Sequence, residues 1–302
     1  MFFSQTRFMK MRPFFHLLIL LFFWGNGAAA KVYFIQINHD AQAISAGEIL
    51  PKNIRKFDKT WFCHSVKADQ PDTLAKYFRQ GFDFDDGTFQ LVHIHGMWGG
   101  KERFMAENVL DFQSDFLEND SLPFQHLLFV LWDANAGNYF KNRAVGQTDA
   151  PILGAVFRAL HAAFPATRFT VQTHSMGAWI LANAIRTTPL PDGLFAGLFF
   201  YAPDLSEKEL QGIENQLFTL FEKVFIFYHK KDLALKISTR KNGVKRIGRN
   251  PTPATAPRAN WVDCTGKKCQ GLPAKISKHL YYRSSRAVRK EILHRMAQIG
   301  RT

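Results

Sequence analysis

Cysteine is scarce in this chain of 302 residues, which has only Cys63, Cys264 and Cys269. Three thiols can form one disulfide at most, and their spacing matches no zinc-binding motif. The N-terminal residues described next predict export to an oxidising environment, so we predict that Cys264 and Cys269 pair across the short CTGKKC loop. Cys63 then remains as a buried thiol within a strand. The sequence thus excludes a scaffold held together by many disulfides.

Long hydrophobic runs are absent beyond Trp24. The apolar run over residues 14–24 is too short for an anchored membrane helix, which needs roughly 20 residues. Basic residues precede this run and small residues follow it: Arg7, Lys10, Arg12 and the segment NGAAA at 26–30. These are the three parts of a secretory signal peptide. We expect residues 1–30 to be cleaved after Ala30, with retention as an N-terminal anchor as the alternative.

Acidic residues are fewer than basic ones, 25 against 39, and the formal net charge is +14. Three of these charges lie within residues 1–30, which leaves +11 for the mature chain. Such an excess favours contact with anionic envelope surfaces, and it serves solubility equally well. The basic run over 230–249 raises nucleic-acid binding as a rival function. Export and the lack of a recognition-helix or base-stacking motif argue against it, so no nucleic-acid partner is predicted.

Apolar runs of strand length alternate with helical stretches in residues 31–302. This alternation predicts one α/β domain with a mostly parallel sheet and helices on both faces. The expected strands are 32–37, 59–63, 89–94, 127–132, 168–172, 194–201, 224–228 and 261–264. The clearest helices are 73–80, 106–118, 152–163, 177–187, 206–222 and 285–298. Ser206 and Glu209 form a capping box at the start of the fifth helix, and residues 236–260, rich in Lys, Arg, Gly, Pro and Thr, are predicted to form a long basic loop.

Ligands of such a sheet bind at the carboxyl ends of its strands. The stretch TVQTHSMGAWI, residues 170–180, runs from a strand into a helix with Ser175 at the corner. A nucleophile elbow requires small residues two positions before and two positions after the serine. Gly177 meets the second requirement, whereas Thr173 occupies the first position. The competing interpretation is that Ser175 only caps an ordinary helix.

Acyl transfer by serine also needs a base and a carboxylate, in the chain order Ser, Asp or Glu, His in hydrolases of this fold. Asp232 and His279 follow later strands in that order. Taken alone, each is open to a plainer interpretation, as a solvated loop acid and a surface histidine. Asp204, in YAPD after the strand over 194–201, is the alternative acid.

His93 and His95 would lie on one face of a strand, which is the geometry of a metal pair. The sequence offers no third and fourth ligand, so neither a metal nor an organic cofactor is predicted. In the preferred interpretation the chain turns at Gly96, with His95 shaping the loop. The N–H of Met97 then becomes the second oxyanion donor beside that of Met176.

Six blocks carry a resemblance: HIHGM, VLWDANAGNYFKNRAVG, THSMGAWILANAI, FYAPDLSEKEL, VFIFYHKKDLALKIS and VDCTGKKCQGLPAKISKHLYYRSS. Over residues 89–293 the chain resembles a bacterial α/β-hydrolase family of unknown function in the esterase/lipase superfamily. In that family an HSMG elbow is followed by an APD block, a D-x-A-L-x-x-S block and a terminal H-x-Y block. The joint order of these four blocks is the most specific part of the resemblance.

The resemblance implies the α/β-hydrolase fold, with Ser175 as nucleophile, His279 as base and Asp232, in preference to Asp204, as acid. Three positions depart from the family pattern. WDAN at 132–135 stands where W-P-S is usual, Thr173 replaces the first elbow glycine, and Leu280 follows the histidine. These departures concern the shape of the pocket more than the triad.

The predicted function is that of an exported serine hydrolase, periplasmic or extracellular, that cleaves small-molecule or lipid esters through an acyl-enzyme on Ser175. The alternative is a catalytically inactive hydrolase fold that serves as a binding module at the cell envelope. No stable transmembrane anchor is expected. The sequence leaves open the substrate, the acyl-chain length, the oligomeric state and whether residues 236–260 act as a lid.

Overall fold

The computed structural model describes residues 31–53, 56–85, 87–97, 99, 124–134, 138–269 and 278–299. The predicted signal peptide and the helix expected over 106–118 lie outside the described residues. Residues 31–302 form one compact unit. No helix among the described residues is long and apolar enough to cross a membrane.

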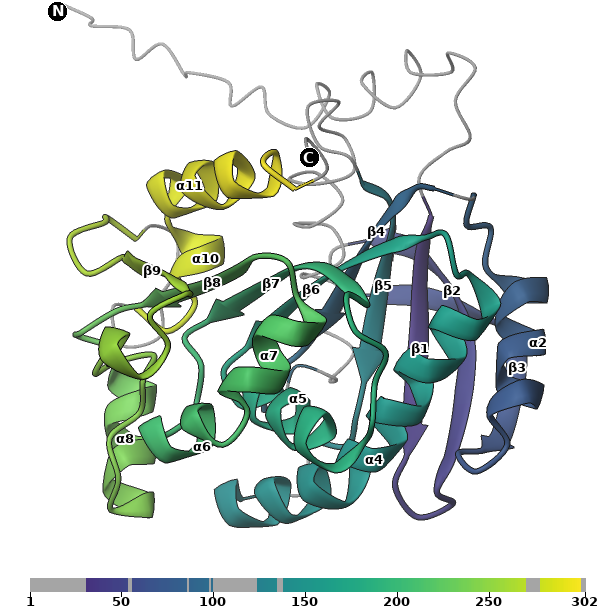
Figure 1. Cartoon of the computed structure of the whole chain (residues 1–302), viewed down its shortest axis with the longest axis horizontal. Coiled ribbons are helices and arrows are strands. Elements are labelled where there is room, and N and C mark those ends of the chain that lie inside the picture. The colour runs from purple at the N-terminus through teal and green to yellow at the C-terminus, as the bar shows by residue number, and fades with distance from the viewer. Residues whose placement is uncertain are drawn as a thin grey trace, which may run out of the picture. The chain divides into compact units, whose positions relative to one another are not determined.

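One mixed sheet organises this unit, in the strand order β3-β2-β1-β5-β4-β6-β7-β8-β9 (Figure 1). The strands are β1 (Val32–Asn38), β2 (Ala43–Asn53), β3 (Lys56–Lys67), β4 (Phe89–Ile94), β5 (Phe124–Leu131), β6 (Arg168–His174), β7 (Phe195–Tyr201), β8 (Val224–Tyr228) and β9 (Asn260–Asp263). β2 pairs antiparallel with β1 and β3, and all other neighbours are parallel. The predicted α/β fold with a mostly parallel sheet is confirmed.

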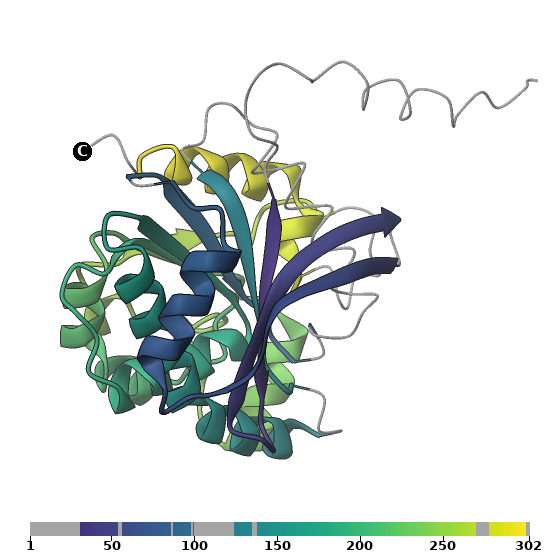
Figure 2. The ribbon, with the colours of Figure 1, turned by 90° about the vertical axis from the view of Figure 1, so that its right-hand side faces the viewer.

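Helices cover both faces of the sheet, as Figures 1 and 2 show. They are α2 (Pro71–Gly81), α4 (Tyr139–Ala163), α5 (Met176–Thr187), α6 (Glu207–Gln211), α7 (Glu214–Leu220), α8 (Leu233–Asn242), α10 (Tyr281–Ser284) and α11 (Arg286–Met296), with a 3₁₀ turn at Pro253–Thr255. Buried side chains of α2, α4, α5 and α7 share one hydrophobic core, and those of α11 belong to a second. The sheet separates the two cores.

Neighbouring residues of the central strands face opposite cores. In β8, Ile226 belongs to the core of α4 and α5, whereas Phe225 and Phe227 belong to the core of α11. A strand that is buried on both faces is a near-continuous apolar run. This is why the apolar runs of the sequence give the bounds of β4 and β8 directly.

β2 is a strand that the sequence did not predict. Its segment AISAGEILPKN contains Gly47 and Pro51, which are poor strand formers. Gly47 is required by close packing, since a Cβ there would lie 2.2 Å from the Thr60 carbonyl oxygen. Pairing on both sides, with β1 and β3, therefore overrides the local preference of β2.

Two predicted helices have different bounds in the structure. The helix expected over 152–163 is the second half of α4, which begins after the cap Asn138 and continues through Pro151. A proline removes one helical donor, and burial of residues on both sides of it holds the helix together. The helix expected over 206–222 is divided at Gly212 into α6 and α7. The predicted Ser206 capping box is confirmed.

The long loop predicted over 236–260 is wrong in its first part, because α8 continues to Asn242. Two helix signals flank that segment. Asp232 Oδ1 accepts a hydrogen bond from Leu235 N at 2.9 Å as an N-cap. Gly243 ends the helix in the left-handed conformation, with φ of 67°. The helix was not predicted because the high Lys and Arg content of residues 236–260 was taken to indicate a loop.

The predicted disulfide between Cys264 and Cys269 is wrong, because all three cysteines are free. Cys264 Sγ faces the Val262 carbonyl at 3.9 Å, and Cys269 Sγ faces the Lys267 carbonyl at 3.8 Å. The prediction that Cys63 is a buried thiol in a strand is confirmed. Burial raises the pKa of Cys264 to about 12 and that of Cys63 to about 11. Both buried thiols are therefore poor nucleophiles.

Candidate active site

The carboxyl ends of β4 and β6 form the centre of the candidate site. The chain leaves β4 toward β5 on one side and leaves β6 toward β7 on the other, so the strand order reverses between them. Such a reversal opens a crevice at the carboxyl edge of a parallel sheet. His95 follows β4 and Ser175 follows β6, and the residues after β8 and β9 lead to Asp232 and His279.

Ser175 occupies a strained backbone corner between β6 and α5. Its φ is 54° and its ψ is −118°, a region that residues other than glycine rarely adopt. The end of β7 supports this corner on both sides: Ser175 N donates to Tyr201 O at 2.9 Å, and Asp204 N donates to Ser175 O at 3.1 Å. The Ser175 side chain makes no N-cap hydrogen bond to α5. Ser175 is therefore not an ordinary helix cap.

Close backbone approaches surround the corner. A Cβ at Gly177 would lie 2.4 Å from Ile94 O, and one at Gly96 would lie 2.9 Å from His174 O. Thr173, which replaces the first elbow glycine, is fully buried and pairs with Ile94 of β4 and Phe200 of β7. The corner therefore depends on Gly177, while the sheet accommodates a β-branched residue at 173.

The two expected oxyanion donors lie on the same side of the sheet. Met176 is the first residue of α5, so its N–H has no acceptor within the helix and lies at the positive end of the helix dipole. Met97 lies in a turn closed by a hydrogen bond from Gly99 N to Gly96 O at 3.0 Å. Met97 and Met176 both line the cavity that contains Ser175.

Asp232 and His279 are brought together across 47 residues of sequence. His279 Nδ1 lies 2.7 Å from Asp232 Oδ2, and the Asp232 side chain is fully buried. Burial disfavours the charged form of His279, but the charge and the hydrogen bond of Asp232 outweigh it, and the pKa of His279 is raised. The Nδ1–H is held by the carboxylate, which leaves Nε2 of the neutral ring as the acceptor.

Ser175 and His279 line one cavity of about 450 Å³. Within the part of the chain that the structure describes, no hydrogen bond joins the Ser175 hydroxyl to the His279 ring. Contacts of this kind are often long in a free enzyme and tighten when substrate binds. The two side chains therefore share one cavity without a direct hydrogen bond between them.

Asp204, the alternative acid, contacts other side chains and not His279. It accepts hydrogen bonds from Tyr139 Oη at 2.8 Å and Ser238 Oγ at 2.5 Å. The buried Arg246 guanidinium lies 3.2 Å from Asp204 Oδ1, the oxygen that also accepts from Ser238, and 3.1 Å from Glu209. Asp204 thus links Tyr139, Ser238 and Arg246 at the wall of the cavity. Asp232 is the carboxylate that contacts His279.

Two residues that the sequence analysis did not select hold His279 in place. Tyr281 is fully buried, and its hydroxyl accepts from Ala202 N at 2.7 Å and donates to Phe227 O at 2.6 Å. The His174 ring lies 4.6 Å from the His279 ring, and its Nε2–H donates to the His279 carbonyl at 3.2 Å. Burial lowers the pKa of His174 well below its ordinary value, so this ring is neutral. The position of Tyr281 in the H-x-Y block was the available signal.

His95 shapes the loop after β4, as expected. Its Nδ1–H donates to Gly96 O at 2.7 Å, and its Nε2 accepts from Trp132 N at 3.3 Å. The Trp132 indole stacks on the imidazole and donates to the His95 carbonyl at 2.9 Å. Both ring nitrogens of His95 are engaged in the protein, so His95 is not arranged as one half of a metal pair with His93.

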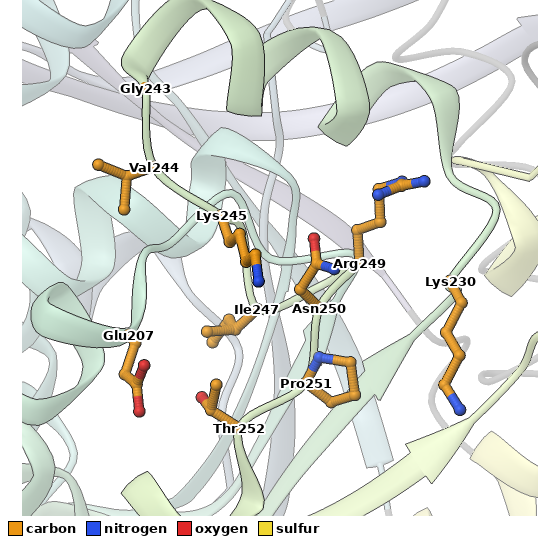
Figure 3. A pocket seen from close by; sticks show the side chains of 10 residues that line it. All are labelled: Glu207, Lys230, Gly243, Val244, Lys245, Ile247, Arg249, Asn250, Pro251 and Thr252. Atoms are coloured by element: carbon orange, nitrogen blue, oxygen red, sulfur yellow. The ribbon is translucent and has the colours of Figure 1, made fainter.

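A second cavity, of about 760 Å³, lies beyond the end of α8 (Figure 3). Residues that follow α8 form most of its lining, together with Glu207 and Lys230. It contains none of the residues predicted to be catalytic. The reactive side chains gather in the smaller cavity, which is therefore the candidate active site.

A mostly parallel sheet with a strained serine after one strand, and a histidine–aspartate pair after later strands, is the arrangement of α/β hydrolases. The family model described as "Alpha/beta hydrolase of unknown function (DUF900)" matches residues 77–294, and the chain belongs to this family. The chain is also similar to the crystal structure of a predicted CIB-like hydrolase from Thermoplasma acidophilum. That similarity has 14% sequence identity, covers 71% of this chain and 89% of that chain, and has a TM-score of 0.41. No curated protein matches the chain.

Proposed function

We propose that the chain is a serine hydrolase that cleaves carboxylic esters through an acyl-enzyme on Ser175. The observation that carries the proposal is the hydrogen bond of 2.7 Å between Asp232 and His279, whose ring lines the same cavity as the strained Ser175 corner. A nucleophile, a base and an orienting carboxylate are the three parts that acyl transfer by serine requires.

Each step follows from the roles of these side chains. His279 Nε2 takes the proton of Ser175 as Oγ attacks the ester carbonyl. The carbon–oxygen bond to the alcohol then breaks, and His279 returns the proton to the leaving alkoxide. Water, deprotonated by the same ring, attacks the acyl-enzyme; the bond from the acyl carbon to Oγ breaks, the acid is released, and His279 returns the proton to Ser175 Oγ. These steps use only side chains, backbone groups and water.

The N–H groups of Met176 and Met97 are proposed to bind the oxyanion that forms at each attack. Support comes from their place on the lining of the Ser175 cavity and from the free N–H at the start of α5. Preorganised donors of this kind contribute strongly to acyl transfer, and loss of one costs about 10² to 10³ in turnover.

A fluorophosphonate probe tests the proposal on the purified mature protein. We expect covalent labelling of the wild type and none of Ser175→Ala. Ser238→Ala is the matched control, because Ser238 lines the same cavity but donates to Asp204, and it should keep its labelling. Equal labelling of wild type and Ser175→Ala, or labelling of neither, would contradict the proposal. Aryl esters of increasing acyl length then separate a short-chain esterase from a lipase.

We also propose that residues 1–30 export the protein, so that it acts in the periplasm or outside the cell. The basic, apolar and small-residue segments of a signal peptide support this location. Expression of the full chain with a C-terminal tag, followed by fractionation and N-terminal sequencing, tests it. Export predicts a mature N-terminus at Lys31 outside the cytoplasm. Full-length protein confined to the cytoplasm would contradict it.

A further inference from the structure

We propose that the ester substrate carries an anionic group beside an apolar chain, and that Lys241 binds this group at the mouth of the active-site cavity. The inference rests on the proposed function, because it names the substrate class of the same site. It goes beyond that function by assigning a specificity residue that lies outside the triad.

The cavity is suited to a hydrocarbon chain. Its apolar lining comes from the loop after β4, from α8 and from the residue after His279: Met97, Ala234, Leu235, Ile237 and Leu280. Binding sites for small apolar groups are commonly cavities of this kind with a few convergent polar groups. The polar groups of this cavity therefore decide which apolar esters it accepts.

One cation on the described lining, Lys241, has no carboxylate to bind it. Among the described residues, Asp204, Lys241 and Arg283 are the Asp, Glu, Lys and Arg side chains that line the cavity. The Asp204 carboxylate is bound by the buried guanidinium of Arg246, 3.2 Å away and outside the lining. Lys241 thus faces the cavity with no carboxylate of the described lining left to bind it. A substrate with a negative charge would supply such a partner.

Lys241 is placed to bind a negative charge on the substrate, because it lines the cavity and also reaches solvent. It is exposed, and it forms no ion pair within the described part of the chain. Its ammonium nitrogen lies 5.7 Å from the centre of the Tyr139 ring. Ile237, four residues earlier on the same side of α8, is 46% exposed and lines the same cavity. Ile237 and Lys241 are both exposed and both line the cavity, so they form one wall of its mouth. This wall presents an apolar side chain followed by a cation, which complements an anionic amphiphile.

The second cavity supplies a matched control. Lys245 is also exposed and lies four residues after Lys241, on the other side of Gly243. Its side chain lines the cavity shown in Figure 3 and not the one that contains Ser175. Lys245→Gln therefore removes the same charge from the same neighbourhood without changing the active-site wall.

Paired aryl esters test the proposal. One is the mono-para-nitrophenyl ester of octanedioic acid, and the other is the same ester with its free carboxylate capped as an N-methyl amide. We expect Lys241→Gln to raise KM for the anionic ester and lower kcat/KM about fivefold, the upper range for an exposed ion pair. The neutral ester should be unaffected, and Lys245→Gln should behave as wild type with both. Added salt should weaken the preference of the wild type for the anionic ester.

A second pair of substrates distinguishes a carboxylate on the acyl chain from a phosphate on the alcohol. Fatty-acid release is measured from monomeric dioctanoyl phosphatidylglycerol and dioctanoyl phosphatidylcholine. A selective loss for Lys241→Gln with phosphatidylglycerol alone assigns a phosphate headgroup, and one with the octanedioic ester alone assigns an acyl carboxylate. Equal effects of Lys241→Gln and Lys245→Gln, or equal effects on charged and neutral substrates, would overturn the inference while hydrolysis persists. No turnover of any ester and no labelling dependent on Ser175 would contradict the proposed function itself.

Discussion

Asp232 contacts His279 with one carboxylate oxygen and caps helix α8 with the other. Oδ2 lies 2.7 Å from His279 Nδ1, and Oδ1 accepts from Leu235 N at 2.9 Å to cap α8. The cap fixes the carboxylate in one orientation, and full burial keeps water from competing for it. The start of α8 thus sets the direction from which the base is held.

Replacing Asp232 tests this arrangement. Asp232→Asn should reduce kcat by about 10⁴-fold, as expected when the carboxylate of a triad no longer fixes the tautomer of its histidine. Asp204→Asn should retain turnover, because Asp204 contacts Tyr139, Ser238 and Arg246 and not His279. Steady-state kinetics on variants that show the wild-type circular dichroism spectrum provide the measurement. Loss of turnover in the Asp204 variant alone would exchange the two roles.

The pH dependence should follow His279. Burial alone would lower its pKa, but the Asp232 charge and hydrogen bond raise the pKa above 6.5. A base must be neutral to accept a proton, so kcat/KM should fall as pH decreases through an apparent pKa above 6.5. Asp232→Asn removes the raising influence and should move the acid limb to lower pH. A wild-type limb well below 6.5 would show that His279 is not the titrating base.

Gly177→Ala should disrupt the elbow. The new Cβ would lie 2.4 Å from Ile94 O and 2.8 Å from His95 O, so the strand or the helix must shift. We expect a loss of about 1–3 kcal/mol or more in the free energy of unfolding, measured by urea denaturation, together with loss of activity. Gly266→Ala is the control, since a Cβ there meets nothing within 4 Å. Equal stability of the two variants would contradict the predicted packing.

Tyr281→Phe should affect both stability and turnover. The change removes a buried hydroxyl that bonds Ala202 N and Phe227 O, which costs about 1–3 kcal/mol when such partners are left unsatisfied. His279 lies two residues away, so kcat should fall with little change in KM. Tyr77→Phe, at an exposed tyrosine, is the matched control. A Tyr281→Phe variant with wild-type kcat would show that this anchor does not position the base.

The central strands and the order of the reactive residues could be predicted because short segments of the sequence are enough to indicate both. Strands buried on two faces are apolar runs, and parallel strands collect their carboxyl ends at one edge. Ser175 and Asp232 follow such strands, and His279 comes after the short edge strand β9. Their places after parallel strands are enough to expect them near one another. The structure adds what spacing cannot supply, namely that Asp232, and not Asp204, contacts His279.

Other features depend on partners distant in sequence. The basic run over 230–249 suggested a surface for nucleic acid, yet Arg246 within it is 2% exposed and binds Asp204 and Glu209. Tyr281 and His174 support His279 through hydrogen bonds to segments far away in sequence: Tyr281 bonds to residues at the ends of β7 and β8, and His174 bonds to the His279 carbonyl. Long-range hydrogen bonds of this kind leave no periodicity in the sequence, so pattern analysis does not find them.

The backbone support of the Ser175 corner is independent of the serine side chain. Tyr201 O and Asp204 N hold its backbone, and neither bond involves the serine hydroxyl. A Ser175→Gly variant would adopt the positive φ without strain and keep the cavity, but it would lack the proposed nucleophile. Under the proposed function, this single substitution would end the chemistry and leave the ligand cavity in place, so it would convert a hydrolase into a binding protein.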